Sequence, residues 1–260
     1  ATWKVEMANS CVKSFCSSLL LTLFWSRFAL LSAAGPNSQV LVVGSVNADI
    51  LVPVDRFPEE GENVVARETE DSGRIVAGGK GANQAVSCAR LDVKTSFVCQ
   101  LSEDPNGCML RRELEANAVD LSLAQRSAKP SGLGVVFLRP DGSVSAVVVG
   151  AANAHWPDLD AEALFAGREV LAVMLQMEVP QHVNAAVARA ARARGVPVFQ
   201  DAGGAETPLA DLEEHLANCD YLSPNETELK RLTGMPVDTN EEVVAAARAL
   251  QARARGGGGG

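Results

Sequence analysis

The sequence predicts a three-layer α/β/α fold with a mostly parallel central sheet and a small additional β-sheet. Short apolar segments rich in β-branched residues recur between residues 39 and 222, as strands buried on both faces require. Helical patterns separate them, and this alternation is typical of parallel strands joined by helices. Two hairpin patterns, at about 50–67 and 133–149, interrupt it. They predict a separate sheet that forms a lid over a site or an oligomer contact.

The strands of the central sheet are expected where apolar runs meet polar turns. The first, 39–44 (QVLVVG), carries no charged residue and suits a strand covered on both faces. Later segments share this pattern and are expected to continue the sheet at 95–101, 170–177, 196–200 and 219–222.

Two pairs of alternating segments are expected to form the small sheet. Segments 50–54 and 62–67 alternate as exposed strands do, with the turn 58–61 (PEEG) between them. Segments 133–138 and 144–149 form a second pair around another turn that contains Pro and Gly.

The helices are expected between these strands. Pro180 at a helix start and Gly195 just past its end bracket one of them, and Thr239 with Glu242 caps the last. The apolar spacing places the helices at 82–91, 109–116, about 180–194 and 241–255.

Composition favours small-molecule chemistry. The 260 residues carry a formal net charge of -9 and 5% aromatic residues, which is a poor basis for binding nucleic acid or an anionic membrane. The six cysteines form no C-x-x-C pair and the three histidines are scattered, so the sequence has no zinc-site spacing. We therefore expect no nucleic-acid partner and no membrane partner.

The two ends differ from the rest of the chain. Residues 7–48 contain no acidic residue and are rich in serine and leucine, as targeting segments are. Residues 1–36 are therefore expected to be a disordered leader, either a targeting segment or untranslated sequence, with the plastid or the cytoplasm as the destination. The domain 37–255 is followed by a poly-glycine tail, 256–260, where an alternating fold calls for another strand. We expect the domain to be incomplete there.

Residues 78–85 (GGKGANQA) indicate a ligand-binding turn. The glycine pair Gly78 and Gly79 permits backbone angles closed to other residues, and a helix start next to it would attract an anion or a polyhydroxylated ligand. The segment is not a P-loop, because Arg74 stands where a glycine is needed and Gly81 where a Ser or Thr is needed. A tight strand-to-helix turn without a ligand is the alternative.

Polar residues follow several predicted strands, on the side where open α/β sheets bind ligands. Asn47 and Asp49 come after the first strand and project to one side, so they offer an amide and a carboxylate to adjacent hydroxyls. Glu178 and Asp201 end later strands in the same way. An Asx turn is the alternative interpretation of Asn47 and Asp49.

Four motifs together resemble those of the ribokinase-like (PfkB-type) carbohydrate kinases, most closely the ribose-phosphorylating plant and algal members. They are 43–49 (VGSVNAD), 78–85, 174–178 (MLQME) and 222–229 (LSPNETEL). The resemblance covers about residues 39–255 and implies a transferase of ribose metabolism that moves a phosphoryl group from ATP to D-ribose, giving ribose 5-phosphate. It further implies Mg²⁺ and, at the family level, K⁺ as cofactors.

The resemblance also implies roles for individual residues. Asp201 stands where many members have an Asn near the ATP phosphates, and Asn225 with Glu228 matches an N-x-x-E motif that helps place Mg²⁺ and phosphate through water. Asn225 and Glu228 equally have the spacing of a helix capping box. The positions that match the family's sugar-binding residues are Asn47, Asp49, Gly78, Gly79, Lys80, Asn83 and Glu178.

Other implications concern the whole domain. The hairpins match a β-lid that covers the sugar and commonly forms a homodimer contact. The family's catalytic Asp lies in a later G-A-G-D motif that has no match up to Arg255, so no catalytic residue is assigned and the chain as given is expected to turn over little ATP. Fructokinase or adenosine kinase activity, and a non-catalytic sugar-binding protein derived from a kinase, are the alternatives.

Overall fold

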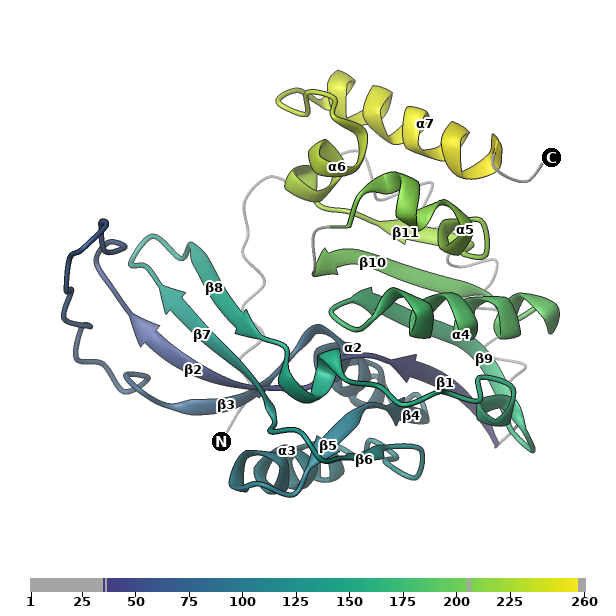
Figure 1. Ribbon diagram of the computed structural model, residues 1–260, viewed down its shortest axis with the longest axis horizontal. Coiled ribbons are helices and arrows are strands. Elements are labelled where there is room, and N and C mark those ends of the chain that lie inside the picture. Colours follow the sequence, from purple (N-terminus) through teal and green to yellow (C-terminus); the bar gives the residue numbers. More distant parts are fainter. Residues whose placement is uncertain (1–34, 36, 205–206, 257–260) are drawn as a thin grey trace.

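The computed structural model describes residues 35, 37–204 and 207–256 (Figure 1). The expected leader 1–36 lies outside these residues apart from Gly35, and the expected glycine tail does so apart from Gly256, which ends the last helix. The described chain forms a five-stranded sheet, a four-stranded sheet and a two-stranded ladder.

The five-stranded sheet is parallel throughout, in the order β11-β10-β9-β1-β4. Its strand β1 lies inside the sheet, and Leu41, Val42 and Val43 are fully buried. The predicted, mostly parallel central sheet is confirmed. Its strands are β1 (Ser38–Val43), β4 (Thr95–Val98), β9 (Glu169–Met177), β10 (Val198–Gly204) and β11 (Tyr221–Ser223).

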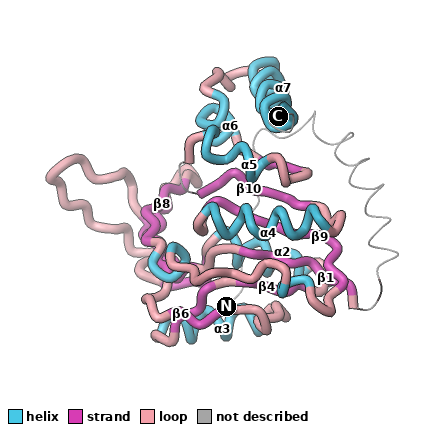
Figure 2. The backbone as a smooth tube through the Cα atoms, turned by 45° about the vertical axis from the view of Figure 1, so that its right-hand side comes forward, coloured by secondary structure: helices cyan, strands magenta, loops and turns pink. Residues whose placement is uncertain are grey.

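Helices cover both faces of this sheet and make three layers (Figure 2). On one face α2 and α3 pack against Val42 and Phe97, and on the other α4 packs against Leu41 and Val43. Alternate residues of β1 thus belong to two separate cores, as a strand covered on both sides requires. The helices are α2 (Lys80–Arg90), α3 (Pro105–Ala116), α4 (Gln181–Ala193), α5 (Glu213–Leu216), α6 (Glu226–Thr233) and α7 (Asn240–Gly256).

The four-stranded sheet stands beside the central one, at the left of Figure 1. Strand β2 pairs antiparallel with β3 and parallel with β7, and β7 forms an antiparallel hairpin with β8. Residues 44–46 alone separate β1 from β2, so the base of this small sheet is tied to the central sheet. Its strands are β2 (Asn47–Pro53), β3 (Ile75–Gly78), β7 (Gly132–Leu138) and β8 (Val144–Val149).

The first predicted hairpin is wrong in its second strand. Segment 62–67 is not a strand, and the antiparallel partner of β2 is β3, which belongs to the glycine motif. Val65 is 91% exposed, so the alternating pattern there has no sheet to pack against. The second hairpin lies where the sequence predicts it.

Several further elements differ from the prediction. Strand β10, expected at 196–200, runs on to Gly204, and β11, expected at 219–222, begins only at Tyr221. The helices expected at 82–91 and 109–116 begin earlier, at Lys80 and Pro105, because Gly79 and Asp104 occupy their N-cap positions. The single strand expected at 95–101 is divided: β5 (Gln100–Ser102) follows β4 and pairs with β6 (Gln125–Ser127) in the two-stranded ladder. Short 3-10 helices fill connections at η1 (Ala151–Ala154), η2 (Ala163–Phe165) and η3 (Leu209–Leu212).

The cysteines of the described residues form no disulfide. Cys88, Cys99, Cys108 and Cys219 are all free, and Cys99 is fully buried. Among the described residues, every helix is too short or too polar to cross a bilayer.

Candidate functional site

Most of the predicted sugar-side residues meet where the two sheets join. Asn47 and Asp49 lie on one face of β2, and their neighbour Gly78 ends β3. Lys80 begins α2, and Glu178 follows β9 directly. The small sheet thus supplies an amide and a carboxylate, while the central sheet and its helix supply a second carboxylate and an amine.

Glycines on both neighbouring strands make room for the Asp49 carboxylate. A Cβ built on Gly78 would lie 1.9 Å from Asp49 Oδ2, and one built on Gly134 would lie 2.2 Å from Asp49 Oδ1. Any side chain at either position would displace this carboxylate. Gly78 is therefore required because it has no side chain. Its backbone angles are those of an ordinary strand residue.

The pKa of Asp49 is raised to about 6, mainly because the carboxylate is partly buried and further because of the negative charge of Glu178. A carboxylate with these properties is typical of functional sites, where burial and like charge accumulate together. Asp49 gains most from a ligand that donates hydrogen bonds to it.

Glu178 is fixed by groups from two other elements. Its Oε2 accepts a hydrogen bond of 2.5 Å from Ser45 Oγ and one of 2.9 Å from the backbone N of Lys80. The next two amides of α2, at Gly81 and Ala82, donate to Oγ and O of Ser45. The start of α2 therefore already holds an anion, and that anion is Glu178 of the same chain.

The glycines at this helix start allow very close backbone contact. Gly79 has a φ of 90° and lies so near β2 that a Cβ would meet the backbone atoms Asn47 N and Ser45 O at 3.0 Å. A Cβ on Gly81 would lie 2.7 Å from Ser45 N. Both glycines let α2 begin directly against the junction of β1 and β2.

Lys80 joins the sugar side to Asp201, which lies within β10 and does not end the strand as predicted. Lys80 Nζ lies 3.3 Å from Asp201 Oδ1, and the same oxygen accepts a 2.8 Å hydrogen bond from Gly203 N. A Cβ on Gly203 would lie 2.1 Å from Lys80 Nζ, so the lysine packs directly over this glycine. The Lys80 ammonium group therefore has a counter-ion on the central sheet.

Asn225 and Glu228 form the capping box that the sequence left open. Asn225 Oδ1 accepts from Glu228 N, and the Glu228 carboxylate accepts from Asn225 N, both at 2.8 Å. Ser223 ends β11 and pairs with Asp201 of β10, so Asn225 follows the end of the strand next to Asp201. Asn83 is exposed on α2, and no side-chain hydrogen bond joins it to the other site residues described.

Two residues of this site escaped sequence reasoning. Ser45 lies inside the motif 43–49, and its position beside Asn47 was the available signal. Asn153 lies 106 residues from Asn47 in sequence, yet its side chain donates to Asn47 Oδ1 at 2.7 Å. The small residues around Asn153 form no recognisable motif, so nothing in the sequence pointed to it.

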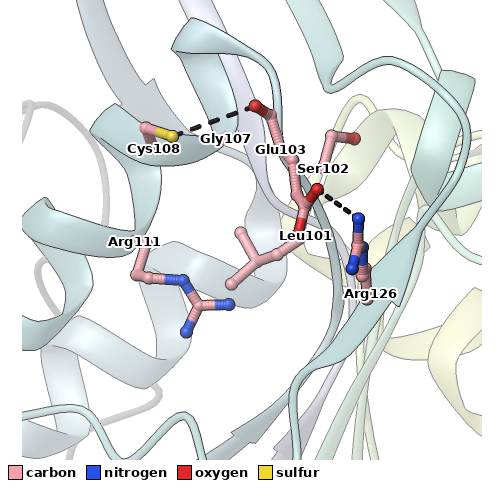
Figure 3. Close-up of a pocket in the computed structure, with 7 residues that line it drawn as sticks. All are labelled: Leu101, Ser102, Glu103, Gly107, Cys108, Arg111 and Arg126. Atoms are coloured by element: carbon pink, nitrogen blue, oxygen red, sulfur yellow. Dashed lines mark hydrogen bonds and ion pairs between the residues drawn. The ribbon is translucent and has the colours of Figure 1, made fainter.

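A separate hollow of about 340 Å³ lies between α3 and the two-stranded ladder (Figure 3). Arg126 is paired with Glu103 there, and Cys108 contacts the Glu103 carbonyl at 4.0 Å. None of the predicted site residues lines this hollow. We assign no ligand to it.

Comparisons with known proteins identify the family. The model of the pfkB family of carbohydrate kinases matches residues 37–255, which is most of the chain. This chain belongs to the pfkB family. Among curated members, the ribokinase of Arabidopsis thaliana is 44% identical over 209 residues, and the deoxyribokinase of Salmonella typhi is 31% identical over 218 residues.

The match to these pfkB relatives is partial in length. It covers 78% of this chain and 54% of the Arabidopsis ribokinase, and 82% of this chain and 68% of the Salmonella deoxyribokinase. The solved structure of Arabidopsis thaliana ribokinase complexed with ribose and ATP superimposes with a TM-score of 0.70 at 41% identity. That match covers 83% of this chain and 69% of that chain, and it supports the three-layer architecture.

Proposed function

We propose that this chain contributes the sugar-binding site of an ATP-dependent kinase that converts D-ribose to ribose 5-phosphate. The observation that carries the proposal is the pair Asn47 and Asp49 on one face of β2, opposite Glu178 and Lys80. The structure of a 41% identical relative, complexed with ribose and ATP, supports the choice of ligands.

Each side chain has a distinct task in this proposal. Asn47 and Asp49 bind neighbouring sugar hydroxyls, and Gly78 keeps the Asp49 carboxylate accessible from the site. Lys80 neutralises negative charge between the sugar and the end of β10, where ATP would supply the phosphoryl group. Because phosphoryl transfer depends mainly on positioning and charge, such residues account for the sugar side of the reaction.

Magnesium fits this site only through the nucleotide. Among the described residues, no group of three or more His, Cys, Asp or Glu side chains could hold a metal ion. The carboxylate of Glu228 is engaged by Asn225 N. Mg²⁺ commonly keeps several waters and binds through substrate phosphates, so we assign it no direct protein ligand.

Calorimetry with D-ribose tests the proposal. We expect the full chain to bind ribose and Asp49→Ala to abolish measurable binding, because the acceptor for a sugar hydroxyl is lost. The matched control is Asp55→Ala, two residues beyond the end of β2, where the carboxylate is 77% exposed and pairs with Arg67. Equal ribose affinity of the Asp49→Ala variant and the unaltered chain would contradict the assignment.

A substrate panel separates the alternatives. The product of the complete reading frame, supplied with ATP and D-ribose, 2-deoxy-D-ribose, D-fructose or adenosine, is expected to release ADP fastest with D-ribose. 2-Deoxyribose is included because a deoxyribokinase is among the relatives. Binding of ribose without ADP release would favour a non-catalytic sugar-binding protein.

We propose further that a second copy of the chain covers strand β8. This edge strand exposes several valines, which a soluble surface rarely leaves uncovered. Val147→Asp is expected to yield monomers in sedimentation velocity, whereas the control Val65→Asp, on an exposed loop, is expected to leave a dimer. A monomer from the unaltered chain would contradict this. The exposed valines of β8 are Val144, Val147, Val148 and Val149.

A further inference from the structure

Asn153 lies beside Asn47 and pairs with the backbone next to it. The Asn153 side chain, in η1, is 1% exposed. Its Oδ1 accepts a hydrogen bond of 2.9 Å from Val46 N, and its Nδ2 donates to Val46 O at 3.0 Å and to Asn47 Oδ1 at 2.7 Å. Both hydrogens of the Asn153 amide are therefore used.

These partners allow only one orientation of the Asn153 amide. Val46 offers it one N–H and one C=O, so the reversed amide would place N–H against N–H and oxygen against oxygen. Since Asn153 Nδ2 faces Asn47, the atom of Asn47 opposite it has to be an acceptor, Oδ1. Asn47 therefore turns its Nδ2 hydrogens, which no described residue accepts, away from Asn153.

The surroundings keep this arrangement in place. Trp156 Nε1 donates to Asn153 O at 2.8 Å, and Asn153 N donates to Gly150 O at 2.8 Å. Gly132 leaves space for the contact, because a Cβ there would lie 2.3 Å from both Asn153 Nδ2 and Asn47 Oδ1. The two amides therefore meet in a space too small for a different side-chain packing.

We propose that Asn153 is a positioning residue that presents Asn47 to the ligand as a hydrogen-bond donor. The inference rests on the sugar site proposed above and specifies its chemistry: Asn47 donates and the ionised Asp49 accepts, two residues apart on one face of β2. Adjacent hydroxyls satisfy both, since a hydroxyl donates and accepts. A ligand that offers only acceptors, such as sulfate, would meet the Asp49 carboxylate unfavourably.

A double-mutant cycle on ribose affinity tests the coupling. Asn47→Ala and Asn153→Ala are each expected to weaken ribose binding by the full chain about tenfold, the loss of roughly one hydrogen bond. The double variant is expected to bind as weakly as Asn47→Ala and no weaker, because Asn153 acts through Asn47. Independent, multiplying losses would overturn the proposal.

The variant Asn47→Asp tests the donor assignment itself. An aspartate keeps the acceptor that faces Asn153 Nδ2 and loses the donor that faces the ligand. We expect the variant to fold with a lowered thermal midpoint, because the new carboxylate is buried near Asp49, and to bind ribose at least tenfold more weakly, since a donor is replaced by an acceptor. Retained affinity would show that Asn47 offers an oxygen to the sugar and would overturn the proposal.

An NMR measurement without ligand separates this proposal from the proposed function. In the ligand-free chain both side-chain hydrogens of Asn153 are expected to be protected from exchange with water, and those of Asn47 to exchange faster. Rapid exchange at Asn153 would overturn the positioning role even if ribose binds. Protected Asn153 hydrogens in a chain that binds no ribose would reject ribose as the ligand and leave the positioning role supported.

Discussion

Asp49 and Glu178 are two carboxylates of one site in unlike surroundings. Glu178 accepts hydrogen bonds from Ser45 Oγ and Lys80 N, so it organises the backbone around it. Asp49 lies over glycines, and within the described residues no hydrogen bond reaches its carboxylate. Oε2 of Glu178 is therefore engaged within the site, whereas the whole Asp49 carboxylate remains free for a ligand.

The raised pKa of Asp49 predicts pH-dependent ribose binding. The ionised carboxylate accepts a sugar hydroxyl, and it takes up a proton as pH falls through about 6. We expect ribose affinity at pH 5 to be about tenfold lower than at pH 7.5, because about one carboxylate in ten is then ionised. Calorimetry at the two pH values measures this, and Asp49→Asn is expected to remove the dependence.

The same group affects stability with the opposite sign. Its pKa in the folded chain lies above the ordinary value of 3.8, so the folded state binds the proton first as pH falls from about 6. Protonation of Asp49 thus stabilises the fold in the range where it weakens ligand binding. If ribose affinity instead increased as pH was lowered from 7.5 to 5, the ionised Asp49 carboxylate would not be the acceptor for a sugar hydroxyl.

At the scale of elements, the start of α2 is held by several contacts with other parts of the chain. A single residue, Gly79, separates this helix from β3, and the helix begins directly against the β1–β2 connection. Ser45 and Glu178 take its first amides, while Gly79 combines a left-handed φ with backbone contacts at 3.0 Å. Positioning of Lys80 thus depends on a glycine that no other residue can replace without movement.

Substitution of this glycine measures the junction. Gly79→Ala is expected to lower the free energy of unfolding by more than 2 kcal/mol, roughly the sum of left-handed strain and backbone overlap. The control is Gly195→Ala, with a φ of 68° and no atom within 4 Å of a Cβ, which should cost about 1 kcal/mol. Urea unfolding compares the two variants, and equal losses would show that the close contact is unimportant.

The elements also show where sequence reasoning succeeds. The segment 39–44 was recognisable because a strand covered on both faces needs an apolar run without charged residues. The segment 62–67 was wrongly predicted as a strand, because alternation in a short polar stretch does not show that a neighbouring strand is available. Which strand pairs with β2 is decided by tertiary packing, and the partner is β3. The capping box at Asn225 was foreseen because its contacts are three residues apart.

At the scale of the whole molecule, the site is built from contacts between distant parts of the chain. Ser45 and Glu178 are 133 residues apart, and Asn47 and Asn153 are 106 apart. Motifs could nominate Asn47, Asp49 and Glu178 singly, since each follows a strand. Spacing in the sequence could not show that Glu178 fills the start of α2, because that contact exists only once the sheet is assembled.

The buried residue His215 makes the stability of the fold depend on pH. Its Nε2 lies 2.7 Å from Oε1 of Gln200 in β10, and burial lowers its pKa from 6.5 to about 4. The unfolded chain therefore binds this proton more readily between pH 6.5 and pH 4. Stability falls as pH falls through that range, by up to about 3 kcal/mol from this residue alone.

Urea unfolding at several pH values checks this contribution. The unaltered chain is expected to lose stability from pH 7 to pH 4.5, and His215→Gln is expected to lose less, because glutamine does not ionise. A pH dependence identical in both proteins would assign the acid sensitivity to other groups.

The short connection 44–46 between β1 and β2 affects how the two sheets could move relative to each other. Asn47 and Asp49 stand on the first residues of β2 and move with the small sheet, whereas Glu178 and Lys80 stand on the large sheet and its helix. A tilt of one sheet against the other would separate Asn47 and Asp49 from Glu178 and Lys80. The geometry within each pair would not change. Grip and release of a small molecule would then require bending where the two sheets are joined, including residues 44–46 and Gly79, which connects β3 to α2.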